Sequence, residues 1–351
     1  DLTGRVISRT MAAQNLIGKT ALVHLASCTK HLSSDIKIYA KCEHMNPTGA
    51  IKDRIVSHIF DCAESRGELK KGATVVAATS GNTGASVAML SSLRGYKAIV
   101  ITNSKTSAEK CDIMRAYGAE VIVGPSGVPA DSPDHYQNMA KTLCDKNPEY
   151  FDVNQYDNSD NPAAYTLTLG PEILLDCPSI SHFVAAGSTG GTFSGTSKFL
   201  KSTTSDQVST FLADPIGSIF FEYWQSGTVT APGKFKVEGV GKDSIPGVLN
   251  IKLCDGVVRV SDEAAFARCH QLAEEEGLLV GGSSGLNVQA AVQLAESLKE
   301  GPATIVTVLP DSGFKYLSKV FNPEWLEANA FQTRPGCPVF PPRNPDDVHL
   351  E

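Results

Sequence analysis

Short runs of apolar, often β-branched residues alternate along the chain with segments in which apolar residues recur every three or four positions. The short runs predict buried β-strands. They cover residues 36–40, 74–78, 98–102, 120–123, 183–186, 210–213 and 304–309. Residues 52–65 and 262–276 place apolar side chains on one helical face, and Ser261 is suited to cap the second helix. This strand-then-helix order predicts an α/β protein with mostly parallel sheets.

The composition narrows the class of protein. The chain has 351 residues, of which 42% are hydrophobic and 20% charged, and its formal net charge is −7. These values are typical of a globular protein with one or two sizeable cores, and they argue against disorder and against a default nucleic-acid binder. The apolar runs are strand-sized, well short of the ~18 residues that a membrane helix needs. We therefore expect a soluble protein that binds neither nucleic acid nor membranes.

The cysteines and histidines indicate the redox compartment and whether a metal is bound. Nine cysteines, an odd number, are scattered without a CxxC pair, and the eight histidines are equally dispersed. This pattern favours a reducing compartment, which we take to be the cytoplasm or alternatively an organelle, and predicts no structural metal.

The two ends of the chain differ from the rest of the sequence. The first residue is Asp1 rather than methionine, which indicates a truncated or processed N-terminus. Residues 331–351 form a proline-rich tail.

Three turns rich in small residues follow apolar runs, where ligands bind in open α/β sheets. Residues 79–84 (TSGNTG) offer hydroxyls and N–H groups at a helix start, which suits a carboxylate. Residues 187–192 (GSTGGT) have the form of an anion nest for a phosphate. Residues 281–285 (GGSSG) form the third turn. Each turn alone is also compatible with an ordinary strand-to-helix connection.

A lysine near the start of a predicted helix indicates which reaction these turns could support. The segment NPTGAIKDR, residues 46–54, brings Lys52 to the first position of an amphipathic helix. The helix dipole there disfavours a cation, which should lower the proton affinity of the amine. Most lysines are solvated surface groups. A nucleophilic lysine combined with a phosphate nest and a carboxylate nest, however, is what pyridoxal-phosphate chemistry on an amino acid requires.

In this order along the chain, the motifs resemble those of the cysteine synthase and cystathionine β-synthase family of fold-type II pyridoxal-phosphate enzymes. The resemblance covers about residues 16–329. It implies a two-domain, three-layer αβα fold with mostly parallel sheets, similar to the β-subunit of tryptophan synthase. Residues 1–41 and 154–330 would form a large cofactor-binding domain, and residues 42–153 a small mobile substrate-binding domain. The resemblance also implies a homodimer that acts on small molecules.

The resemblance assigns site residues one by one. Lys52 would be the catalytic residue and would hold pyridoxal 5′-phosphate as a Schiff base. The other cofactor contacts would be Asn82, Ser188, Thr189, Gly190, Gly191, Thr192 and Ser283. The substrate contacts would be Thr79, Ser80, Gly81, Asn82, Thr83, Gln155, Tyr156 and Gly239. Ser188 departs from the family pattern, which usually has glycine at this position.

The implied reaction is β-replacement on L-serine or an O-activated L-serine, through an external aldimine and an aminoacrylate. Lys52 would act as general base, and a serine opposite the ring nitrogen would favour prompt loss of the β-substituent. A sulfur nucleophile, sulfide or homocysteine, would then add at Cβ. Another anionic nucleophile, such as sulfite, thiosulfate or an amino acid, is an alternative, because Lys242 lies in the segment expected at the mouth. A non-catalytic paralogue that binds a partner's C-terminal carboxylate is a further alternative.

Overall fold

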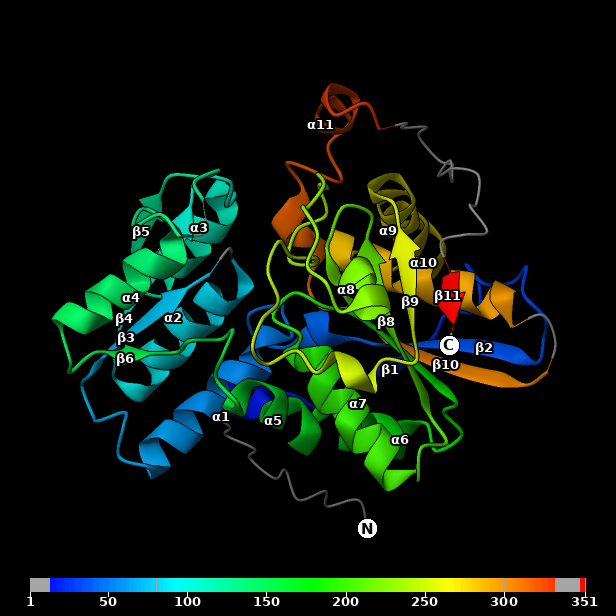
Figure 1. Cartoon of the computed structure of the whole chain (residues 1–351), viewed down its shortest axis with the longest axis horizontal. Coiled ribbons are helices and arrows are strands. Elements are labelled where there is room, and N and C mark those ends of the chain that lie inside the picture. The colour runs from blue at the N-terminus through cyan, green and yellow to red at the C-terminus, as the bar shows by residue number, and fades with distance from the viewer. Residues whose placement is uncertain (1–12, 80, 130, 299–300, 332–347, 351) are drawn as a thin grey trace, which may run out of the picture.

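The computed structural model describes residues 13–79, 81–129, 131–298, 301–331 and 348–350, which form two β-sheets surrounded by helices (Figure 1). The larger sheet has seven strands, and its outer strands β1 and β11 are antiparallel to their neighbours while the inner strands are parallel. Its strands, in spatial order, are β1 (Leu22–His24), β2 (Ile36–Lys41), β10 (Ala303–Val308), β7 (His182–Ala186), β8 (Ser209–Pro215), β9 (Gly256–Val260) and β11 (Val348–Leu350).

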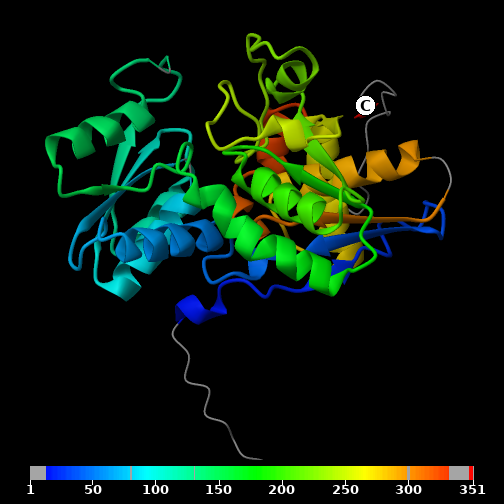
Figure 2. The ribbon, with the colours of Figure 1, turned by 60° about the horizontal axis from the view of Figure 1, so that its bottom comes forward.

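The smaller sheet has four strands, all parallel. In spatial order they are β5 (Glu120–Gly124), β4 (Lys97–Asn103), β3 (Thr74–Ala78) and β6 (Phe151–Asp152). The helices that surround this sheet are α1 (Lys52–Ser65), α2 (Asn82–Arg94), α3 (Ala108–Ala116) and α4 (Tyr136–Lys146). The sheet with its helices lies to one side of the larger sheet in both views (Figures 1 and 2).

Helices cover both faces of the larger sheet because its central strands are apolar on both faces. On β7, Val184 packs into one core cluster, whereas Phe183 and Ala185 pack into another. The first cluster contains residues of α9 (Asp262–Glu276) and α10 (Gly282–Ser297). The second lies under α5 (Asp160–Leu167), α6 (Leu169–Asp176) and α7 (Gly191–Thr203).

The remaining helices are short. They are α8 (Phe220–Ser226), α11 (Pro323–Ala328) and the single 3₁₀ turns Ala13–Leu16, Glu43–Met45, Ile251–Leu253 and Gly313–Tyr316. Helix α1 connects the two sheets through the second core cluster. Its Ile55, Ile59 and Phe60 are fully buried together with Val75 of β3 and Leu169 of α6. The helix is therefore packed against elements of both sheets.

The predicted α/β fold with mostly parallel sheets is confirmed. All seven predicted strands are present within one or two residues, and both predicted helices coincide with α1 and α9, the latter with the expected Ser261 cap. The sequence analysis did not foresee β1, β6, β9 and β11, of which β11 lies in the proline-rich tail. No helix in the described part of the chain is long and apolar enough to cross a membrane. The domain boundaries remain a prediction.

Candidate active site

One cleft gathers most of the predicted site residues. It has a volume of about 540 Å³, open solvent included, and lies where turns after β3 and β7 meet the N-terminal ends of α1, α2 and α10. The predicted residues that line it are Lys52, Thr79, Asn82, Thr83, Gln155, Tyr156, Ser188, Thr189, Gly239 and Ser283. Gly81, Gly190, Gly191 and Thr192 belong to the same two turns without lining the cleft, and Ser80 lies outside the described residues.

The turn before α1 is fixed to the end of β10, and this positions Lys52. The Ile51 N–H donates to the Pro310 carbonyl at 2.8 Å, and the Ser312 N–H donates to the Gly49 carbonyl at 3.0 Å. Gly49 has φ +71°, a left-handed conformation that favours glycine. The fixed turn directs the first residue of α1 into the cleft.

The environment of Lys52 favours a neutral amine. Burial lowers the pKa of Lys52 to about 8, although the charge of Asp311 acts in the opposite direction. About a tenth of the amine is thus unprotonated at pH 7, far more than for a lysine in water, as a nucleophile or a general base requires. The sequence analysis predicted this direction from the helix dipole, whereas burial is the larger cause.

Three helices at the cleft begin at a glycine N-cap and, like α1, α4, α5, α6 and α8, have no side-chain cap. The N-cap residues of α2, α7 and α10 are Gly81, Gly190 and Gly281, and glycine has no side chain that could bond to the free N–H groups of the first turn. Helices such as α3 and α9, by contrast, are capped by serine side chains. The uncapped N–H groups can therefore bind anionic groups of a ligand.

The turn before α7, where a phosphate nest is predicted, contains two glycines that close packing requires. Gly190 has φ +86° and ψ −11°, and a Cβ added there would lie 2.6 Å from the Leu249 Cβ. A Cβ at Gly191 would lie 2.0 Å from Asn161 Oδ1. Asn161 in turn donates to Thr189 Oγ1 at 3.2 Å and to the Gln155 carbonyl at 2.7 Å. Close packing therefore requires both glycines and connects the nest to α5.

Polar side chains on the predicted carboxylate side are oriented by one another. Thr83 Oγ1 donates to Gln155 Oε1 at 2.7 Å, and Gln155 Nε2 donates to the Ala78 carbonyl at 2.9 Å. The Gly81 N–H donates to Thr79 Oγ1 at 3.1 Å. Thr79, Thr83 and Gln155 are all buried, so these bonds fix their rotamers.

Asn82 is held by two charged residues that the sequence analysis did not assign. Asn82 Nδ2 donates to Asp311 Oδ2 at 2.7 Å, and Lys315 Nζ donates to Asn82 Oδ1 at 2.8 Å. The Tyr316 hydroxyl also donates to Asp311 Oδ2, at 2.6 Å. Burial lowers the pKa of Lys315, while Asp311 and Asp53 act to raise it. The PDSG motif at 310–313 was the available signal for Asp311, but no local pattern marks Lys315.

Charged groups surround the mouth of the cleft. Lys110 Nζ forms an ion pair with Glu238 Oε2 at 2.6 Å and lies 4.5 Å from the centre of the Tyr316 ring. Lys319 pairs with the other oxygen of Glu238. Lys242 Nζ lies 4.8 Å from the centre of the ring of Tyr156, which lines the cleft. Sequence reasoning identified Lys242 and the segment of Glu238 but not the two other lysines.

The residues present fit pyridoxal phosphate. The cleft combines a lysine amine of lowered pKa, an uncapped helix N-terminus suited to a phosphate, and the buried hydroxyl of Ser283. It also has the second uncapped helix, α2, beside buried hydroxyl and amide groups. A phosphorylated aldehyde and an amino acid carboxylate require this set of partners.

Comparisons with known proteins point to the same cofactor. The family model described as "Pyridoxal-phosphate dependent enzyme" matches residues 13–311. Cysteine synthase 1 of Neurospora crassa is 37% identical over 316 residues, which cover 89% of this chain and 83% of that protein. Cystathionine beta-synthase of Rattus norvegicus is 36% identical over 316 residues, covering 90% of this chain but 56% of that protein.

Two solved structures are also similar. The crystal structure of O-ureido-L-serine synthase has a TM-score of 0.80 at 29% identity, covering 88% of this chain and 94% of that one. An O-acetylserine dependent cystathionine beta-synthase from Helicobacter pylori has a TM-score of 0.80 at 34% identity, covering 88% and 97%. The predicted cofactor and the predicted resemblance are confirmed, and the chain belongs to the pyridoxal-phosphate dependent enzymes, in the family of cysteine synthase and cystathionine β-synthase.

Proposed function

We propose that the protein replaces the β-substituent of L-serine or an O-activated L-serine with a sulfur nucleophile. The observation that carries this proposal is the position of Lys52, whose pKa is lowered to about 8, in a cleft with uncapped helix N-termini. The similar proteins support it, because the names of two solved structures refer to O-ureido-L-serine and to O-acetylserine. Both are serine derivatives with an activated β-oxygen.

Each part of the cleft has a role in this proposal. Bound pyridoxal phosphate supplies an electron sink for the carbon that loses its proton. The N-terminus of α7 would hold the phosphate of the cofactor, and the neutral hydroxyl of Ser283 would serve as the partner of its ring nitrogen. The N-terminus of α2, with Thr79 and Gln155, holds the substrate carboxylate and fixes the orientation of Cα. Lys52 removes the α-proton as general base.

The charge at the mouth of the cleft indicates which kind of nucleophile can enter. Lys242 is mostly buried, with 14% of its side chain exposed, and it lies over Tyr156, a predicted substrate contact. Its partner Asp243 is 3.7 Å away and 61% exposed, so it screens the lysine only weakly. A cation at this point attracts an anion that enters the cleft. We infer that the nucleophile is hydrosulfide or homocysteine, with sulfite, thiosulfate or another amino acid as the alternatives.

The experiment is a visible absorbance titration of the holoenzyme with L-serine and with O-acetyl-L-serine, followed by each candidate nucleophile. We expect the cofactor band to shift with one donor and to return when the correct nucleophile is added, with the new amino acid identified by mass spectrometry. Lys52→Ala should lower turnover by roughly 10²–10⁴-fold or more. Lys71→Ala, at an exposed turn position, is the matched control.

Two results would contradict the proposal. Full turnover in Lys52→Ala would exclude its role as base. Saturable binding of peptides with a free C-terminus, with no turnover of any serine donor, would favour the carboxylate-binding alternative. A homodimer, and closure over the substrate by the part of residues 42–153 that carries the smaller sheet, are further parts of this proposal, testable by light scattering and by small-angle scattering with and without donor.

A further inference from the structure

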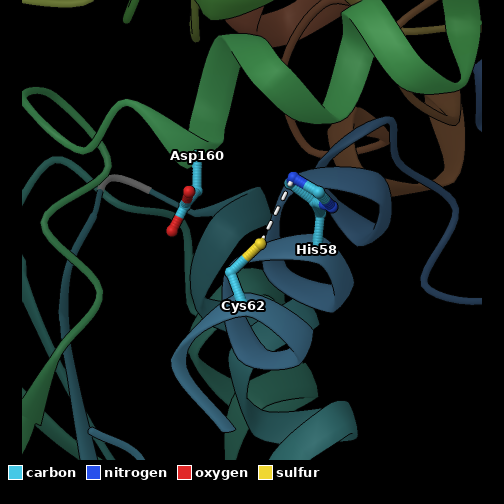
Figure 3. Close-up of side chains that lie close together, drawn as sticks. All are labelled: His58, Cys62 and Asp160. Carbon is cyan, nitrogen blue, oxygen red and sulfur yellow. Dashed lines mark hydrogen bonds between the residues drawn. The ribbon is translucent and has the colours of Figure 1, made fainter. Parts of the chain in front are cut away.

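A cysteine, a histidine and an aspartate converge outside the cleft. His58 and Cys62 are one turn apart on α1, so their side chains share a helix face, and Asp160 is the first residue of α5 (Figure 3). One ligand atom from each residue lies within 4.8 Å of the other two, and this is the one such group among the described residues. None of the three lines the cleft.

The spacing of the cluster is compatible with a metal ion. Cys62 Sγ and His58 Nε2 are 3.5 Å apart. Two ligands at the usual zinc–sulfur and zinc–nitrogen distances, at the tetrahedral angle, would be separated by roughly 3.6 Å. A metal ion between these atoms would take the place of the proton that they now share. An oxygen of Asp160, within 4.8 Å of both other atoms, would have to move closer to them to complete three ligands.

Charge and accessibility also favour this assignment. A thiolate and a carboxylate together carry two negative charges, which balance a divalent cation, and the imidazole is neutral. Arg66 Nη2 donates to Asp160 Oδ2 at 2.8 Å. The Arg66 side chain is 45% exposed, so it can move into solvent when a metal ion arrives. All three ligand residues are partly exposed, which leaves a route for the ion and a fourth position for water.

We propose that His58, Cys62 and Asp160 form a binding site for Zn²⁺, with water as the fourth ligand. Sulfur, imidazole and carboxylate ligands in a tetrahedral arrangement suit zinc, whereas Mg²⁺ and Ca²⁺ prefer oxygen ligands alone. Spacing along the sequence does not reveal the site, because Asp160 reaches the two α1 residues only in the folded chain. The prediction of no structural metal considered cysteines and histidines alone.

The site connects two helices that contribute to the cleft. Helix α1 begins with Lys52, and Asn161, next to Asp160, donates to Thr189 Oγ1 and to the Gln155 carbonyl. A bound ion would cross-link α1 to the start of α5. It would thereby restrict motion between the general base and the predicted phosphate nest, and stabilise the folded protein by mass action.

The test uses metal-stripped holoenzyme titrated with Co²⁺, a spectroscopic substitute for Zn²⁺. We expect saturation at one ion per chain, with a thiolate-to-cobalt charge-transfer band in the difference spectrum that Zn²⁺ abolishes. Cys62→Ser should remove the band, and Asp160→Asn should weaken binding about tenfold or more. Cys144→Ser is the matched control, because Cys144 is also partly exposed on a helix, α4, and is free.

A second measurement on the unmodified chain covers the case of a variant that does not fold. Zn²⁺ should protect Cys62, but not Cys144, from alkylation as mapped by mass spectrometry, and should raise the Tm by ~3 °C or more at saturation. The proposal is overturned if Co²⁺ binds no tighter than to Cys62→Ser, if Cys144→Ser removes the band, or if Zn²⁺ leaves the alkylation of Cys62 unchanged. None of these readouts depends on catalytic activity, so they are independent of the proposed reaction.

Discussion

A buried ion-pair network fixes the helix that carries Lys52, and its strength can be worked out from Glu172. Arg54, two residues after Lys52, contacts Glu43 at 2.7 Å through Nε and Glu172 at 2.7 Å through Nη1. Partial burial of Glu172 favours its neutral form. Its hydrogen bonds with Arg54 and the Arg54 charge outweigh this effect, and lower the pKa of Glu172 to about 2 from an ordinary 4.5. The carboxylate therefore stabilises the folded state when it is ionised.

The pKa difference converts to a free energy by linkage. The pKa of Glu172 is about 2.5 lower in the folded than in the unfolded protein, and this difference corresponds to about 3.4 kcal/mol of stability at pH 7. The Glu172 side chain is 20% exposed, so solvent screening reduces this to about 2–3 kcal/mol. Because the folded pKa is the lower one, the contribution is complete above the unfolded pKa of 4.5 and is lost as the pH falls toward 2. At pH 3 the unscreened value would be about 1.4 kcal/mol.

We therefore expect Glu172→Gln to lower the free energy of unfolding by about 2–3 kcal/mol at pH 7, with a difference from the unmodified protein that shrinks below pH 4.5. Urea unfolding of both proteins between pH 7 and pH 3, at fixed ionic strength, measures this. Asp176→Asn is the matched control, since Asp176 pairs with Lys41 but is 37% exposed, and it should cost less than about 1 kcal/mol. A difference for Glu172→Gln that is equal at pH 7 and pH 3 would refute the reasoning.

Three substitutions test the cleft. Gly191→Ala would place a Cβ 2.0 Å from Asn161 Oδ1, so we expect the affinity of the apoenzyme for pyridoxal phosphate, followed by fluorescence, to fall about tenfold or more. Thr83→Val leaves the buried Gln155 Oε1 without its donor and should raise the KM for the serine donor about tenfold, with a smaller change in kcat, in steady-state assays. Lys242→Ala should raise the KM for an anionic nucleophile and make it less sensitive to salt, while the KM for the donor stays constant.

The two nests and Lys52 were predicted from local chain geometry, whereas the single contacts, such as Gln155 and Ser283, were predicted only from the family resemblance. A strand, a small-residue turn and a helix start follow one another within about ten residues, so Thr79 to Thr83 and Ser188 to Thr192 could be recognised directly. Lys52 was found in the same way, as the first residue of an amphipathic helix. Sequence reasoning also foresaw the lower pKa of this lysine, but burial, its larger cause, depends on tertiary packing.

The residues that were missed act across long sequence separations. Lys315 contacts Asn82, and Asp160 reaches the side chains of α1, only because the sheets and helices assemble as they do. A lysine or an aspartate is common on helices and turns, so its local pattern does not distinguish a site residue from a surface residue. The position of β11 could not be predicted from its three residues either, because its register is set by pairing with β9 at the edge of the sheet.

The ion pairs of α1 also bear on how the cleft could close. Helix α1 falls within residues 42–153, the predicted mobile domain, yet Arg54 binds Glu172 of α6, under the larger sheet. Breaking such a buried pair costs roughly 3–5 kcal/mol. We therefore predict that α1 stays with the larger sheet and that the moving unit begins after it.

Distances between spin labels, measured before and after donor is added, test this prediction. The distance between Ser65 on α1 and Leu175 on α6 should stay constant. The distance between Asp112 on α3 and Leu175 should shorten. Equal changes in both distances would mean that α1 moves with the smaller sheet and that the Arg54–Glu172 pair opens during closure.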